Sequence, residues 1–172
     1  WSMGSAVAMS IAKKNKSIVN KLVLITPFSW LGGAVYNEKL AFKIFVSFVR
    51  IRERLFPNFN PKSKFSFLKK SNAINDEYTE WAWNNLHKSK DDFIYADGGR
   101  FVVPYDARPW IENIEAETLV ITGGKDKLVP EETSDDVVKR LKNVIVKTFP
   151  DAGHSVPWTH ENELLNELKE FF

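Results

Sequence analysis

The chain has 172 residues, of which 44% are hydrophobic and 27% charged, and this composition excludes a disordered or collagen-like polypeptide. Its formal net charge of +2 is too small to indicate nucleic-acid binding, and no apolar run reaches the roughly 20 residues that cross a bilayer. The absence of cysteine excludes disulfides and thiolate metal sites and favours a cytoplasmic location. Because the first residue is Trp1 rather than Met, we interpret the chain as the C-terminal part of a longer protein.

Residues 1–29 carry one predicted helix and one predicted strand. Small and apolar residues from Ser2 to Ala12 indicate a buried helix that ends before Asn15. The apolar run at 22–26 (LVLIT), stopped by Pro27, is typical of a strand that is buried on both faces of a parallel sheet.

Residues 30–112 form an insertion of different character, predicted to contain helices at 37–56, 65–70 and 76–88. Between residues 37 and 70, nine basic residues accompany only two acidic ones, with phenylalanines interleaved. The favoured interpretation is a solvated outer face over an apolar inner face. The alternative is a docking surface for an anionic partner, such as a lipid surface or an acidic acyl carrier.

Alternation of strand and helix returns in residues 113–172. Apolar β-type runs predict strands at 118–122 and 144–149, and helical periodicity predicts helices at 130–141 and 160–172. Pro130 suits the first position of the earlier helix. The order of elements predicts an α/β fold, a parallel sheet with flanking helices.

Three residues with catalytic potential, Ser2, Asp126 and His154, each lie where a predicted strand gives way to a loop or helix. Each also has an ordinary structural interpretation: Ser2 as a helix N-cap, Asp126 as a turn residue, and His154 as a surface loop residue. Gly4 would let a neighbouring chain pass closely to a sharp turn at Ser2, and the Met3 N–H would point at a developing oxyanion. Gly153 would permit a tight turn beside His154.

The three residues occur in the order Ser, Asp, His at one edge of the predicted sheet. In this order and in the segment Trp1-Ser2-Met3-Gly4, the sequence resembles the α/β-hydrolase fold family, in particular its capped esterase, lipase and peptidase-like members. The resemblance implies that Ser2 is the nucleophile, Asp126 the triad acid and His154 the general base. It also implies that residues 30–112 are a helical cap between two core segments, 1–29 and 113–172.

The same resemblance places the three strands as the last three of the family's eight. The first glycine of the family's G-x-S-x-G motif, the strand before it and the loop with the second oxyanion donor would then precede Trp1. We accordingly expect residues 1–172 alone to lack turnover and to self-associate through the open edge of the first strand.

The expected activity is hydrolysis of a carboxylic ester, with an amide as the less favoured substrate, through an acyl-enzyme. It needs no metal or cofactor, and the substrate is expected to carry an apolar acyl group. Residues expected to bind substrate are Phe28, Trp30, Phe45, Phe48, Trp81, Val129 and Ser155. The alternatives are a small-molecule receptor on the same fold, or an acyltransferase or lyase that uses the same triad. An aspartate nucleophile is disfavoured because a serine stands at position 2.

Overall fold

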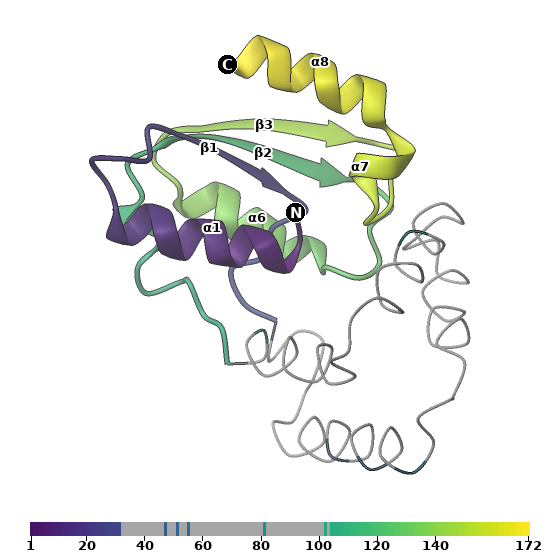
Figure 1. Ribbon diagram of the computed structural model, residues 1–172, viewed down its shortest axis with the longest axis horizontal. Helices are drawn as coiled ribbons and strands as arrows, with labels where there is room; N and C mark the ends of the chain where they lie inside the picture. Colours follow the sequence, from purple (N-terminus) through teal and green to yellow (C-terminus); the bar gives the residue numbers. More distant parts are fainter. Residues whose placement is uncertain (32–46, 48–50, 52–54, 56–80, 82–101, 103) are drawn as a thin grey trace.

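The computed structural model describes residues 1–31 and 104–172, together with Ser47, Ile51, Leu55, Trp81 and Val102 (Figure 1). The expected cap helices at 37–56, 65–70 and 76–88, the basic surface and the boundaries of the cap lie largely outside these residues.

A parallel sheet of three strands organises the described core. Its strands are β1 (Lys21–Ile25), β2 (Glu117–Gly123) and β3 (Val144–Phe149), and β2 lies between the other two. The middle strand is almost entirely buried, which explains its continuous apolar sequence. The α/β fold class is therefore confirmed, and each strand lies within one residue of its predicted bounds.

Helices cover both faces of the sheet (Figure 1). Helices α1 (Met3–Lys14) and α6 (Glu131–Arg140) lie on one face, and α8 (Glu161–Phe171) lies on the other. Two apolar clusters correspond to these faces: Val120 of β2 belongs to the first, and its neighbours Leu119 and Ile121 belong to the second. Because side chains alternate along a strand, β2 contributes to both.

Two short helices were not predicted. One is the 3₁₀ helix η1 (Ile111–Asn113), and the other is α7 (Val156–Thr159), which comes directly before α8. A helix of one turn is too short to show helical periodicity, and Pro157 stands in its first turn, where proline is tolerated. In the part of the chain that the structure describes, no helix has the length and apolar character needed to cross a membrane.

Candidate active site

The loops that follow β2 and β3 approach each other closely at the carboxyl end of the sheet. A Cβ atom added to Gly123 would lie 2.4 Å from the backbone oxygen of Gly153, so only glycine fits without a shift of the backbone. The Lys125 N–H donates a hydrogen bond of 2.8 Å to the Ala152 carbonyl across the same gap. These contacts bring the loops that carry Asp126 and His154 together.

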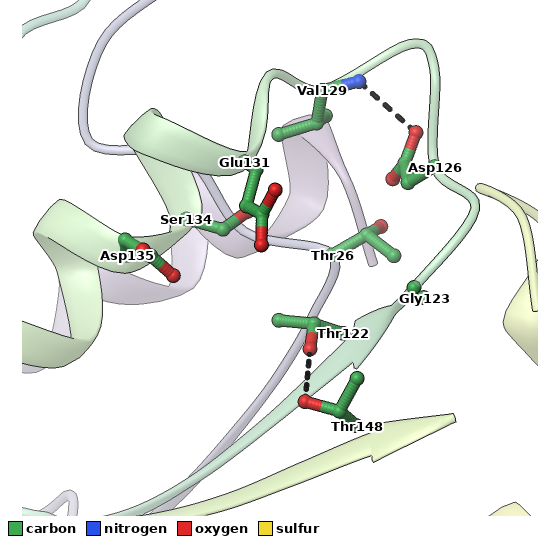
Figure 2. A pocket seen from close by; sticks show the side chains of 10 residues that line it. Thr26, Thr122, Gly123, Asp126, Val129, Glu131, Ser134, Asp135 and Thr148 are labelled. Atoms are coloured by element: carbon green, nitrogen blue, oxygen red, sulfur yellow. Dashed lines mark hydrogen bonds between the residues drawn. The ribbon is translucent and has the colours of Figure 1, made fainter. Parts of the chain in front are cut away.

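Asp126 uses both carboxylate oxygens. Its Oδ1 accepts hydrogen bonds from the backbone N–H groups of Leu128 (2.8 Å) and Val129 (3.1 Å), and Figure 2 shows the bond from Val129. Its Oδ2 lies 2.8 Å from Nδ1 of His154. The structural interpretation of Asp126 as a turn residue is therefore correct, and the turn leaves one oxygen directed at His154.

His154 is buried, with only 2% of its surface exposed, so its interpretation as a surface loop residue is wrong. Because a carboxylate can only accept, Nδ1 carries the proton in the bond to Asp126. The other ring nitrogen, Nε2, is then the one able to accept a proton. This arrangement is the one that a general base requires.

Ser2 directly precedes α1 and has a strained conformation, with φ 52° and ψ −124°. Its N–H donates to the Ile25 carbonyl at 2.9 Å, but its hydroxyl makes no capping hydrogen bond to α1. The structure therefore does not support the helix-cap interpretation. A positive φ is costly for serine and is typical of functional sites.

Met3, whose N–H is the predicted oxyanion donor, is the first residue of α1. Its N–H belongs to the first helical turn, whose donors have no partner within the helix. Among the described residues, no hydrogen bond joins the Ser2 hydroxyl to the His154 ring. The two residues are linked instead through Trp1, whose indole N–H donates to the His154 carbonyl at 2.8 Å.

The tight turn expected beside His154 stays a prediction, although Gly153 does not adopt a positive φ. The prediction for Gly4 is corrected: an added Cβ there would meet no described atom within 4 Å, so no described part of the chain passes closely. The close approach occurs at Gly123 and Gly124 instead, and their adjacent position after a buried strand is the signal that could have revealed it.

The residues expected to bind substrate have different surroundings. Phe28 is buried in the core, edge-on to Tyr105, and Trp30 lies under the guanidinium of Arg108. Val129 and Ser155 are both buried; Val129 lies three residues after Asp126, and Ser155 directly follows His154. Trp81 is half exposed, and its ring centroid lies 5.6 Å from that of Trp158. Phe45 and Phe48 lie outside the described residues. The role of all seven in binding stays a prediction.

Other polar residues near the site have separate partners. Asp151 pairs with Lys125 at 2.5 Å, and His160 contacts the Thr159 hydroxyl and stacks on Phe149. Within the described ranges, no group of three or more acidic, histidine or cysteine side chains could hold a metal ion.

A small polar pocket of about 110 Å³ lies beside Asp126, between α6 and the ends of the strands (Figure 2). Its lining includes carboxylates from Glu131 and Asp135, and the hydroxyl of Thr26, which is buried without a hydrogen-bond partner. Thr26 also has a positive φ of 46°, so it ends β1 rather than continuing it as predicted. The pocket is smaller than the roughly 300 Å³ of typical ligand sites and fits a few water molecules.

Curated relatives of the chain include bacterial hydrolases. It is 26% identical over 170 residues to the 2-hydroxy-6-oxo-6-phenylhexa-2,4-dienoate hydrolase of Burkholderia cepacia. It is 25% identical over 170 residues to the 2-hydroxy-6-oxononadienedioate/2-hydroxy-6-oxononatrienedioate hydrolase of Comamonas testosteroni. Each alignment covers 92% of this chain and 56% of the relative, so the chain spans little more than half the length of these proteins.

Solved structures share the fold. An esterase from Exiguobacterium antarcticum matches with a TM-score of 0.77 at 17% identity, over 99% of this chain and 64% of the esterase. A family model described as the alpha/beta hydrolase fold matches residues 1–161. With the parallel sheet, the helices on both of its faces and this match over most of its length, the chain belongs to the α/β-hydrolase fold family.

Proposed function

We propose that the protein is a serine hydrolase in which Ser2 is the nucleophile, His154 the general base and Asp126 the residue that orients His154. The observation that carries this proposal is the buried hydrogen bond of 2.8 Å between His154 Nδ1 and Asp126 Oδ2. This bond leaves Nε2 as the ring nitrogen that can accept a proton, and the strained Ser2 directly precedes α1. Membership of the α/β-hydrolase fold family supports the same assignment.

In the proposed reaction, Ser2 Oγ attacks the carbonyl carbon of the substrate and transfers its proton to Nε2 of His154. The Met3 N–H stabilises the negative charge that develops on the carbonyl oxygen. When the bond to the leaving group breaks, His154 returns the proton to that group and an acyl-enzyme remains on Ser2. Water then attacks the acyl carbon, His154 again takes and returns a proton, and the acid is released.

We propose a carboxylic ester with an apolar acyl group as the substrate. A second candidate comes from the curated relatives, because the substrates in their names carry oxo and carboxylate groups but no ester. Hydrolysis of such a compound breaks a carbon–carbon bond. The same three residues could serve either reaction, since in both a nucleophile adds to a carbonyl carbon.

The test compares kcat/KM of the intact protein on nitrophenyl esters from acetate to octanoate and on 2-hydroxy-6-oxo-6-phenylhexa-2,4-dienoate. We expect kcat/KM for the esters to rise by about fourfold per added methylene until the acyl-binding site is full. Burial of a methylene contributes about 0.8 kcal/mol. Ser2→Ala should abolish ester hydrolysis. Faster turnover of the dienoate would favour the second candidate.

A small-molecule receptor on the same fold is the non-enzymatic alternative. A receptor would bind ligands with little multiple turnover, so full activity of Ser2→Ala, or stoichiometric binding without product, would contradict the proposed hydrolase. The matched control is Ser10→Ala, because Ser10 lies on α1 and its hydroxyl bonds to the Ala6 carbonyl and to the Tyr105 side chain.

A further inference from the structure

The residue before the proposed nucleophile contacts the proposed general base. The Trp1 indole N–H donates a hydrogen bond of 2.8 Å to the backbone carbonyl of His154, 153 residues away in sequence. The same indole lies 5.2 Å from the His154 imidazole, between ring centroids, with the two planes inclined at 44°. Trp1 therefore contacts both the backbone and the ring of His154.

Trp1 is itself fixed at both ends. Its carbonyl accepts a hydrogen bond from the Gly4 N–H in the first turn of α1, and the next residue, Ser2, is bonded to the Ile25 carbonyl at the end of β1. Its indole also packs edge-on against Trp158 of α7, with 4.8 Å between ring centroids. The backbone at the proposed nucleophile is thereby connected to His154 and to α7, the helix that follows it.

Other contacts hold the neighbours of His154 and its ring: the Lys125 N–H donates to the Ala152 carbonyl, and Asp126 binds the imidazole at Nδ1. Among the described residues, the hydrogen bond to the backbone of His154 itself comes from Trp1. A base that transfers a proton to and from Ser2 must keep a nearly constant distance from it, and a misplacement of about 1 Å can cost about 100-fold in rate.

We propose that Trp1 is a positioning residue, which ties the backbone of the histidine segment to the backbone of the nucleophile and so sets the distance between Ser2 and His154. This inference rests on the proposed function, since it assigns Trp1 a role in the same reaction.

The chain offers a matched control in Trp110. Its indole N–H also donates to a backbone carbonyl, that of Asp106, at 3.0 Å, and its ring also packs edge-on against an aromatic neighbour, Tyr105. Trp110 precedes η1 and has no contact with His154 or Ser2 among those that the structure describes. Trp1→Phe and Trp110→Phe therefore remove the same kind of bond, near the site and away from it.

The experiment measures kcat, KM and Tm of the intact protein and of both variants on the best ester substrate. We expect Trp1→Phe to lower kcat by about 10- to 100-fold, because the ring still packs but the bond to the backbone is lost. We expect its KM to stay within about threefold, because substrate binding is not the property that Trp1 controls. Trp110→Phe should keep kcat and KM. Its Tm should fall by about as much as the Tm of Trp1→Phe.

A second measurement reports on His154 without turnover. The proton on His154 Nδ1 should give a far-downfield NMR signal because it is hydrogen-bonded to Asp126. We expect this signal to broaden or disappear in Trp1→Phe and to persist in Trp110→Phe. This measurement decides the inference even for a variant whose activity cannot be compared.

The inference is overturned if Trp1→Phe keeps kcat within twofold of the parent and keeps the His154 signal, or if Trp110→Phe loses as much activity as Trp1→Phe. Failure of the proposed function has a different signature. In that case Ser2→Ala retains activity, and the NMR comparison alone then decides whether Trp1 positions His154.

Discussion

Two acid–base pairs join the loops after β2 and β3, and they differ chiefly in burial. In the first, His154 and Asp126 approach within 2.8 Å, with side chains only 2% and 9% exposed. In the second, Lys125 and Asp151 approach within 2.5 Å, but their side chains are 60% and 80% exposed. Lys125 and Asp126, which are adjacent on the loop after β2, thus pair with Asp151 and His154 on the loop after β3.

The comparison shows that a short distance does not identify a functional pair. The Lys125 ammonium holds the pKa of Asp151 below its usual range, through its hydrogen bond and its charge. Water screens such a pair, and exposed pairs of this kind contribute little to stability. Asp126 has lost most of its water, and two backbone N–H groups and His154 replace it. Its geometry is therefore fixed, as an orienting residue requires.

The largest expected effect comes from replacing the aspartate of each pair by asparagine, which turns a carboxylate into an amide. Asp126→Asn should lower kcat by about 10⁴-fold, because an amide N–H facing His154 would favour the wrong tautomer, as in serine proteases. Asp151→Asn should keep kcat within error, since Asp151 pairs with Lys125 rather than with His154. Steady-state kinetics on both variants checks this, and a large loss in Asp151→Asn would contradict the distinction drawn between the pairs.

The next effect concerns the close approach of the loops that carry both pairs. Gly123→Ala should destabilise the fold by about 1–3 kcal/mol, because its Cβ would overlap the Gly153 carbonyl. Gly4→Ala is the matched control: its Cβ meets nothing within 4 Å, and alanine in a helix should stabilise by about 0.5–1 kcal/mol. Chemical denaturation measures both. Equal unfolding free energies for Gly123→Ala and Gly4→Ala would show that the loops after β2 and β3 can move apart without loss of stability.

A smaller effect concerns the backbone strain at Ser2, the proposed nucleophile, which neither pair has been shown to share. Its φ of 52° is costly for alanine but not for glycine, so Ser2→Gly should be more stable than Ser2→Ala by about 1 kcal/mol. Both variants should be inactive. Ser10→Gly and Ser10→Ala serve as the control pair, where the order should reverse because Ser10 lies within α1. Identical unfolding free energies for the two Ser2 variants would argue against strain at this residue.

The smallest effect is the pH dependence of the exposed pair. Because the pKa of Asp151 is lowered, its interaction with Lys125 is present above the ordinary carboxylate range and is lost as the pH falls through the lowered value. Lys125→Gln should therefore have a slightly lower Tm than the parent at about pH 7, and the difference should disappear once the pH falls below the lowered pKa of Asp151. A difference that persists at low pH would mean that Lys125 contributes by packing rather than by charge.

Much of the fold follows from the sequence, because buried parallel strands carry a strong local signal. The run at 144–149 coincides with β3, and the runs at 22–26 and 118–122 lie within one residue of β1 and β2. The elements that were missed, η1 and α7, are single turns whose existence depends on tertiary packing. Thr26 was placed in a strand because it closes the apolar run before Pro27, but it has a positive φ and follows the last residue of β1.

The candidate site was predictable only in part. The order of Ser2, Asp126 and His154 indicated which residues to consider, and the structure brings Asp126 and His154 into contact. The burial of His154 and the bond from Trp1 depend on side chains far apart in sequence, which no local pattern reveals. Two of the seven residues expected to bind substrate, Phe45 and Phe48, lie outside the described residues, and the role of all seven remains open to experiment.

The most direct test of the central claim is the position of a covalent adduct. Treatment of the intact protein with a fluorophosphonate, followed by peptide mass spectrometry, should place one phosphonyl group on Ser2. Ser2→Ala should remove the adduct, and His154→Ala should form it far more slowly, because the hydroxyl would lack its base. An adduct on another residue, or undiminished labelling of Ser2→Ala, would contradict the assignment of Ser2, Asp126 and His154 as one catalytic unit.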